Sequence, residues 1–156
     1  MKKYAFGVDI GGTTCKIGFF DTNGTLLDKW EIKTNTENNG ESILSDVAKA
    51  VDNKLAQEAI SKDDVQGIGI GVPGPVDSQG VVHRCVNLGW GVVNVAEELG
   101  NLTGLKIKVG NDANVAALGE MWQGGAKGSK DVIMVTLGTG VGGGIIVDGK
   151  VVAGFN

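Results

Sequence analysis

The sequence has few of the residues on which nucleic-acid, metal and disulfide sites depend. Arg84 is its only arginine and the net charge is −4, so we expect no basic surface and no nucleic-acid partner. His83 is its only histidine and has no cysteine or carboxylate partner at ligand spacing, which argues against a metal site built on it. Cys15 and Cys85 both lie in apolar runs, so we expect buried free thiols rather than a disulfide framework.

Long apolar runs are also absent, whereas glycine is abundant. No apolar stretch approaches the ~20 residues of a membrane-spanning helix, so we expect a cytoplasmic protein without a membrane partner. Hydrophobic residues make up 42% of the 156 residues, and a chain of this length can bury a sizeable core. The 27 glycines are about two and a half times the usual ~7%, and they cluster at the ends of strand-like runs.

The spacing of apolar residues divides the first part of the chain into strands and helices. Three strand-like runs joined by short turns open the sequence and predict an antiparallel meander. Helices and strands then alternate, which gives a βββαβαβα order and predicts an α/β fold with one mixed sheet. The expected strands cover residues 4–10, 16–20, 25–34, 65–74, 81–88 and 105–110, and the expected helices cover 41–60, 94–101 and 114–123.

A glycine-rich loop at residues 124–130 separates this unit from a shorter one. Residues 131–156 have the pattern of a strand, a glycine turn, a second strand, a hairpin turn and a third strand. We therefore predict a first lobe over residues 1–123, a hinge over 124–130 and the start of a second lobe over 131–156.

The second unit repeats the opening of the chain. A shift of 127 residues aligns Ile10 with Leu137, and it aligns the GFFD segment at 18–21 with the IIVD segment at 145–148. Repetition of a whole supersecondary unit at a fixed distance predicts two similar lobes.

Two familiar glycine motifs do not explain the glycine-rich turns. The glycines at 138, 140 and 143 match the dinucleotide-binding pattern G-x-G-x-x-G, but here they open a β-hairpin where that site needs a helix. A Walker A loop is excluded because no Gly-Lys-Ser/Thr run occurs. What remains is two hairpins with Gly/Thr turns, whose free backbone amides and hydroxyls suit an anion.

The first turn, in the stretch VDIGGTTCK, combines glycines, threonines, a lysine and one acid. Glycine lets backbone amides approach phosphate oxygens, the threonine hydroxyls and Lys16 add donors, and Asp9 can hold a hydrated Mg²⁺. Two such turns facing each other would clamp a polyphosphate. The alternative for either turn is a tight hairpin that binds nothing, and the repetition favours the binding site.

Asn111 and Asp112 stand between an expected strand and an expected helix. Either residue can serve as a helix N-cap, a role that Asn and Asp fill well. The same position lies at the carboxyl end of a strand, where open α/β sheets bind ligands, and a carboxylate there can accept a proton from a substrate hydroxyl. The stretch GVPGPVD around Gly74 reads either as a rigid turn or as a loop that presents amides to a ligand.

Five motifs together resemble the bacterial glucokinases of the ROK (repressor, open reading frame, kinase) family, within the superfamily of sugar kinases, heat-shock protein 70 and actin. They are DIGGTTCKIGFFD, GIGVPGPVD, NLGW, NDANVAALGE and LGTGVGGGIIVDGK, in the family's order and over essentially the whole chain. The resemblance implies a ribonuclease H-like lobe of the actin-like ATPase type, followed by the first β-hairpin of a second similar lobe. It implies ATP-dependent phosphorylation of glucose to glucose 6-phosphate, with ATP and Mg as cofactors.

The resemblance also assigns roles to single residues. Asp112 corresponds to the catalytic base that takes the proton from the sugar 6-hydroxyl. The implied sugar-binding residues are Gly74, Asn87, Asn111 and Asp112. The implied nucleotide-binding residues are Gly11, Gly12, Thr13, Thr14, Lys16, Gly138, Thr139 and Gly140. The partners are glucose or a related hexose and ATP, and a homodimer is common in the family.

A full member of the family continues beyond VVAGFN. It adds a Glu/His segment that contacts the sugar, a structural zinc site and the rest of the nucleotide lobe. We therefore expect this chain to be an N-terminal piece that folds but phosphorylates glucose poorly or not at all, with zinc only in the part that is absent.

Three alternatives to a glucose kinase stay open. The acceptor can be another hexose, such as mannose, fructose or an N-acetylhexosamine, because part of the sugar pocket is not in the chain. A sugar-sensing repressor of the same family carries a DNA-binding helix-turn-helix before the kinase-like part, whereas the first strand here starts at Tyr4, which favours the kinase. The last alternative is a module that holds sugar or nucleotide without turnover.

Overall fold

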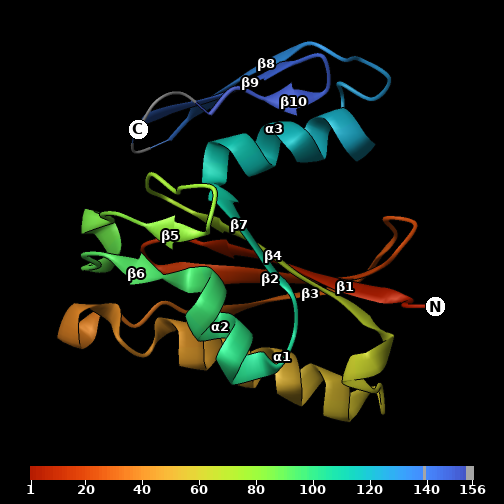
Figure 1. Cartoon of the computed structure of the whole chain (residues 1–156), viewed down its shortest axis with the longest axis vertical. Helices are drawn as coiled ribbons and strands as arrows, with labels where there is room; N and C mark the ends of the chain where they lie inside the picture. The colour runs from red at the N-terminus through yellow and green to blue at the C-terminus, as the bar shows by residue number, and fades with distance from the viewer. Residues whose placement is uncertain (139, 154–156) are drawn as a thin grey trace.

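A five-stranded mixed sheet forms the centre of the protein (Figure 1), whose computed structural model describes residues 1–138 and 140–153. Its strands are β1 Tyr4–Ile10, β2 Thr14–Asp21, β3 Leu26–Lys33, β4 Val65–Val72 and β7 Ile107–Asn111. The order across the sheet is β3-β2-β1-β4-β7. β1, β2 and β3 are antiparallel neighbours, whereas β4 runs parallel to β1 and β7 parallel to β4. The predicted meander and mixed sheet are confirmed.

Two helices, α1 Ile43–Gln57 and α2 Val95–Thr103, cover one face of this sheet (Figure 1). Each helix turns an apolar stripe toward the strands, because apolar residues recur every three or four positions along it. The strands contribute every second side chain to the same core. Buried core residues include Phe6, Val8, Ile10, Ile17, Phe19, Val47, Val51, Leu55 and Leu99.

The third helix, α3 Asp112–Gln123, lies on the opposite face and separates the main sheet from a second one (Figure 1). The second sheet contains β8 Val132–Leu137, β9 Val141–Val147 and β10 Lys150–Val151 in the antiparallel order β10-β9-β8. β9 packs tightly on α3, because a Cβ atom at Gly144 would lie only 2.7 Å from the carbonyl oxygen of Ala113. Glycine at this position therefore sets how closely the second sheet approaches the helix.

The second sheet repeats the meander of the first, but its first hairpin loop is one residue shorter. β1 and β2 meet at the pair Ile10–Cys15, and β8 and β9 meet at the pair Leu137–Val141. The shift of 127 residues read from the sequence therefore holds for the first strand of the repeat and is one residue too long for the second. A shift of one residue moves every side chain of a strand to the opposite face of the sheet. The faces of the two sheets are therefore matched by the pairing register and not by the shift of 127 residues.

Other segments depart from the sequence predictions. The strand expected at 81–88 is wrong in most of its length: only β5 Val81–Val82 is extended, and it pairs with β6 Val93–Asn94. Residues Val86–Leu88 form the 3₁₀ helix η3, since Gly89 in the left-handed region (φ 75°) reverses the chain there. Two further 3₁₀ helices flank α1, namely η1 Glu37–Gly40 and η2 Lys62–Asp64.

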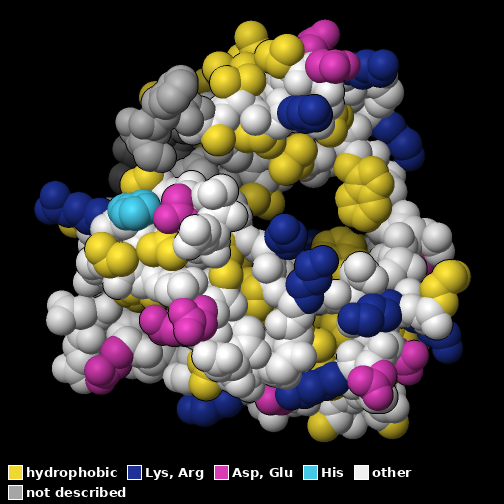
Figure 2. All heavy atoms as spheres, in the orientation of Figure 1, with side chains coloured by type: hydrophobic (Ala, Val, Ile, Leu, Met, Phe, Trp, Pro, Cys, Tyr) yellow, Lys and Arg dark blue, Asp and Glu magenta, His cyan; other side chains and the backbone are white. Residues whose placement is uncertain are grey.

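The face of the second sheet that points away from α3 is apolar and exposed. Figure 2 shows hydrophobic side chains gathered over β8–β10, and an opening between α3 and the main sheet. By the pairing register, this face corresponds to the face of β1 and β2 that α1 and α2 cover. Its exposed residues are Ile133, Val135, Leu137, Val141, Ile145 and Val147.

Both cysteines are buried free thiols, as predicted. Burial raises the pKa of each thiol, so Cys15 and Cys85 are protonated at neutral pH. In the described ranges, every helix is too short or too polar to cross a bilayer.

Candidate active site

A hollow of about 360 Å³ lies at the edge of the main sheet where β1 and β4 end and α3 begins. β1 contributes Asp9, β4 contributes Gly71, α3 contributes Asp112, and β8 of the second sheet contributes Thr136. Open α/β sheets bind ligands beside the carboxyl ends of their parallel strands. The position and the two carboxylates make this hollow the candidate active site.

Asp9 is exposed at the rim of the hollow and pairs with Lys16 across β1 and β2. Directly paired residues of neighbouring strands lie on the same face of a sheet, here the face away from α1 and α2. Desolvation by the surrounding protein raises the pKa of the Asp9 carboxyl, the charge of Asp112 raises it further, and Lys16 opposes both effects. The two carboxylates therefore interact electrostatically across the hollow.

The junction between β7 and α3 fixes the position of Asp112. Asn111 is the helix N-cap, because its Oδ1 accepts hydrogen bonds from the backbone N–H groups of Ala113 at 3.1 Å and Asn114 at 3.3 Å. α3 therefore begins at Asp112, earlier than the expected residue 114. Asp112 is half-buried and lines the hollow, and its Oδ1 accepts a hydrogen bond from the backbone N–H of Ala113 at 2.8 Å.

Asn111 also connects α3 to the loop that follows β4. Its side-chain Nδ2 donates to the carbonyl oxygen of Gly74 at 3.2 Å. A Cβ atom at Gly74 would lie 2.8 Å from the carbonyl oxygen of Arg84, so packing alone requires glycine at that position. The thiol of Cys85 donates to the carbonyl oxygen of Pro73 at 3.3 Å. The GVPGPVD stretch is thus a rigid turn beside the start of α3.

The first glycine turn lies against the loop that contains Asn87. The N–H of Gly11 donates to the carbonyl oxygen of Thr14 at 3.0 Å and closes the turn. A Cβ atom at Gly12 would lie 3.7 Å from the carbonyl oxygen of Asn87, which is an ordinary contact. Gly12, Thr13 and Asn87 are all exposed. Gly12, which is predicted to bind nucleotide, therefore lies beside Asn87, which is predicted to bind sugar.

The second glycine turn follows Thr136, which brings the end of β8 to the hollow. The N–H of Gly138 donates to the carbonyl oxygen of Gly140 at 2.9 Å, and a Cβ atom on either glycine would meet nothing within 4 Å. Both glycines are exposed beyond the lining of the hollow. Thr139, which is predicted to bind nucleotide, lies outside the described residues.

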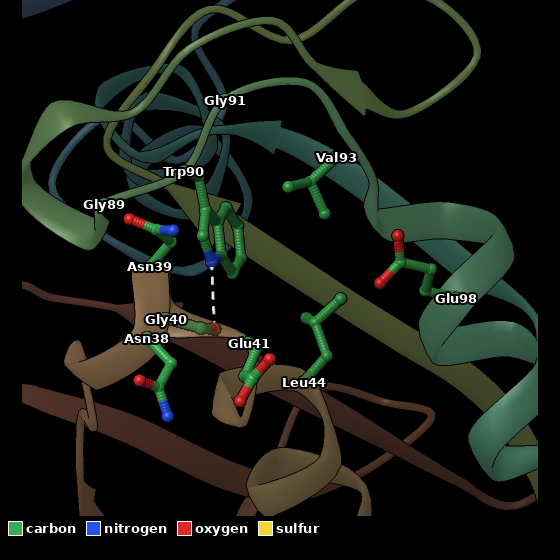
Figure 3. A pocket seen from close by; sticks show the side chains of 10 residues that line it. All are labelled: Asn38, Asn39, Gly40, Glu41, Leu44, Gly89, Trp90, Gly91, Val93 and Glu98. Carbon is green, nitrogen blue, oxygen red and sulfur yellow. Dashed lines mark hydrogen bonds between the residues drawn. The ribbon is translucent and has the colours of Figure 1, made fainter.

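A separate pocket of about 280 Å³ lies between the η1 segment, residues 89–91 and the two covering helices (Figure 3). Trp90 forms one wall; only 5% of it is exposed, and its Nε1 donates to the carbonyl oxygen of Gly40 at 3.1 Å. The exposed carboxylates of Glu41 and Glu98 stand at its edges (Figure 3). No described residue lines both this pocket and the hollow of Asp9 and Asp112. Trp90 therefore packs the fold together away from the candidate site.

The potential metal-binding side chains among the described residues are scattered rather than clustered. His83 is paired with Asp77, with 3.0 Å between Nε2 and Oδ2. Residues 1–138 and 140–153 contain no group of three or more His, Cys, Asp or Glu side chains that could hold a metal ion. Asp9 and Asp112 still suit Mg²⁺, because Mg²⁺ keeps several waters and binds one or two protein carboxylates together with substrate phosphates.

Thr136 is a polar residue of the lining that was not among the predicted site residues. It lies in the β8 sequence VIMVTL, on the face that alternation assigns to the interior with Val132 and Met134. A single polar residue on an otherwise apolar inner face was the signal that could have identified it.

Comparison with known proteins places these features in a family. The sequence matches the ROK family over residues 5–156. A glucokinase from Halalkalibacterium halodurans is 44% identical over 155 residues, which cover 99% of this chain and 47% of the relative. An N-acetyl-D-glucosamine kinase from Yersinia enterocolitica is 35% identical over 97% of this chain and 48% of its own length.

A solved structure shows the same fold. The ROK family glucokinase from Streptomyces griseus, in complex with glucose and AMPPNP, matches with a TM-score of 0.84 and 37% sequence identity. The match covers 97% of this chain and 47% of that protein, and it confirms the mixed α/β fold of the ROK sugar kinases. The chain spans about half the length of the curated relatives it matches.

Proposed function

The chain belongs to the ROK family, and from this premise we propose that it forms the sugar-side lobe of a kinase that transfers the γ-phosphoryl group of ATP to the 6-hydroxyl of glucose. One observation supports the proposal above all others. Asp9 from the end of β1 and Asp112 from the start of α3 line one hollow at the ligand-binding edge of the sheet. Because ATP is supplied in the cytoplasm, we place the reaction there.

Asp112 is our candidate for the general base. Phosphoryl transfer depends mainly on positioning and charge neutralisation, and one carboxylate orients the attacking hydroxyl and accepts its proton. Asn111 caps α3 and donates a hydrogen bond to Gly74. These two contacts hold the start of the helix, and with it Asp112, in one place. Gly74 and Asn87 are our candidates, with Asn111, for contacts to the sugar hydroxyls.

The two glycine turns are our candidates for binding the phosphates of ATP. In the first turn we assign this role to the backbone and hydroxyls of residues 11–14 and to Lys16, and in the second to residues 138–140. Asp9 would hold Mg²⁺ through water, as its place beside Asp112 and its exposure at the rim allow. When bound, Mg²⁺ neutralises charge on the transferring phosphates.

Glucose is favoured over other hexoses as the acceptor because the glucokinase relative is 44% identical, against 35% for the N-acetyl-D-glucosamine kinase. A substrate panel of glucose, mannose, fructose and N-acetylglucosamine tests this choice. We expect the highest kcat/KM for glucose. A higher kcat/KM for N-acetylglucosamine would mean that the acceptor is an N-acetylhexosamine.

We further propose that residues 131–156 begin a second lobe, with 124–130 as the hinge. The second sheet repeats the first meander, and the face that α1 and α2 cover in the first is exposed and apolar in the second. Exposed apolar surfaces of this kind are typical of interfaces. A lobe completed on that face would bring further groups to the second glycine turn.

The experiment that tests the function is a coupled ATP and glucose assay on the protein expressed from its complete reading frame. Asp112→Ala removes the proposed base, and Asp63→Ala removes an exposed carboxylate from η2, away from the hollow. We expect turnover in the wild type and in Asp63→Ala and its loss in Asp112→Ala. A wild type that leaves every hexose of the panel unphosphorylated would refute the proposal.

A further inference from the structure

The first glycine turn is held from behind by Thr34, the residue that follows β3. Thr34 is only 5% exposed. Its hydroxyl donates to the carbonyl oxygen of Gly11 at 2.7 Å, and its backbone N–H donates to the carbonyl oxygen of Thr13 at 2.9 Å. Two carbonyl groups of the turn therefore point inward toward one buried residue.

We propose that Thr34 is a positioning residue that orients the Gly11–Gly12 peptide so that the N–H of Gly12 faces the phosphates of ATP. This inference rests on the proposed function for the identity of the ligand. The peptide group is planar and trans, so its C=O and N–H point in opposite directions. A hydrogen bond that holds the Gly11 carbonyl inward thus holds the Gly12 N–H outward.

Two backbone N–H groups of the turn are free to bind a ligand. In residues 1–138 and 140–153, the N–H groups of Gly12 and Thr13 donate to no other group of the protein. Both residues are exposed. Successive backbone N–H groups in a turn form an anion-binding concavity, and its geometry depends on the orientation of each peptide.

Cys15 fixes the direction of the Thr34 hydroxyl. The Sγ atom of Cys15 lies 3.3 Å from Oγ1 of Thr34. A hydroxyl has one hydrogen, and Thr34 uses it for Gly11, so the thiol of Cys15 is the donor in this contact. Burial raises the pKa of that thiol and keeps its hydrogen in place. The chain of hydrogen bonds runs from Cys15 through Thr34 to Gly11.

The test uses Thr34→Val, which removes the hydroxyl and keeps the shape, and Thr34→Ser, which restores the hydroxyl. Thr103→Val is the matched control, because Thr103 is 1% exposed and its hydroxyl donates to the carbonyl oxygen of Leu99 at the same distance of 2.7 Å, away from the hollow. All variants are made in the protein expressed from its complete reading frame. The measurements are KM for ATP, KM for glucose, kcat and the Gly12 amide resonance.

Thr34→Val should raise KM for ATP by roughly three- to tenfold, the effect of one hydrogen bond, with little change in kcat or in KM for glucose. The Gly12 amide resonance should shift. Thr34→Ser should restore both properties, and Thr103→Val should destabilise the fold while leaving KM for ATP unchanged. An equal rise of KM in Thr103→Val, or an unchanged KM and Gly12 resonance in Thr34→Val, would overturn the inference.

The two proposals fail in different ways. A wild type that binds no ATP would refute the proposed function. The role of Thr34 in orienting the peptide would then be decided by a crystal structure of Thr34→Val. A rotated Gly11–Gly12 peptide supports that role, and an unchanged peptide contradicts it.

Discussion

Asp9 at the end of β1 lies close enough to Asp112 at the start of α3 for the charge of Asp112 to raise the pKa of Asp9. The two residues are far apart in the sequence, on the first strand and the third helix. The fold brings them together because β1 and β4 run parallel and α3 starts at the edge of the sheet where both strands end. Like charges in one hollow repel, so the arrangement lowers stability unless a cation is bound. Perturbed groups of this kind are concentrated at functional sites.

Asp9→Asn should therefore stabilise the protein at neutral pH. Because the pKa of Asp9 is raised on folding, the folded state binds its proton more tightly than the unfolded chain, and ionisation of Asp9 lowers stability as the pH rises. The gain in Tm should be present at pH 7 and disappear as the pH falls below the ordinary Asp pKa of 3.8. Thermal unfolding of both proteins between pH 3 and 8 measures it. A variant less stable than the wild type at pH 7 would show that Asp9 is structural.

Asp112→Ala should lower kcat by about 10²–10⁴-fold, the usual contribution of general acid–base catalysis, while glucose still binds. The N-cap of α3 is Asn111, so Asp112→Ala removes only the contact of Asp112 with the Ala113 N–H, and the loss of activity should come without a large loss of stability. Stopped-flow or coupled kinetics give kcat, and calorimetric titration gives the affinity for glucose. Near-normal turnover would remove Asp112 from the proposed role.

Sequence reasoning predicted the main elements because their apolar periodicity is strong, as in the first meander and in α1. It could not place the start of α3, because Asn and Asp are equally good caps, and only the structure shows that Asn111 accepts the N–H groups of Ala113 and Asn114. The strand expected at 81–88 ends at Val82 because the chain then turns into η3, which a left-handed Gly89 closes. Thr34 has no local signal, since it meets Gly11 only through strand pairing.

Gly12→Val should weaken ATP binding without unfolding the protein. A Cβ atom at Gly12 makes only ordinary contacts, so the added bulk faces the ligand rather than the core. The expected rise in KM for ATP is about ten- to a hundredfold, as for lost hydrogen bonds to a charged group. Gly91→Val is the control, because a Cβ atom there meets nothing within 4 Å. Equal KM values for the two variants would mean that the first turn is only structural.

Asn111→Ala should combine a stability defect with a catalytic one. Loss of the cap and of the bond to Gly74 should cost about 1–3 kcal/mol in the free energy of unfolding. Asn94→Ala is the control. Asn94 caps α2 by accepting a hydrogen bond from the N–H of Glu97, so its loss should destabilise the protein without changing KM for glucose. Urea denaturation and kinetics on both variants separate the effects. An unchanged KM for glucose in Asn111→Ala would restrict Asn111 to capping.

The 156-residue chain alone should phosphorylate glucose far more slowly than the protein from the complete reading frame, because the apolar face of its second sheet is uncovered. The same face should bind the hydrophobic dye ANS. Val135→Lys, in the middle of that face, should reduce the dye signal, whereas Val86→Lys, an exposed residue of η3, should not. Full turnover by the isolated chain would contradict this account of the second lobe.

The most direct measurement of the central claim is a crystal structure of the protein from its complete reading frame with glucose and AMPPNP. The claim predicts the sugar 6-hydroxyl within about 3 Å of the Asp112 carboxylate, the reach of a general base. It also predicts the phosphate groups between the first and second glycine turns, on the side of Asp9. A sugar hydroxyl out of reach of Asp112, or phosphates bound away from both turns, would contradict it.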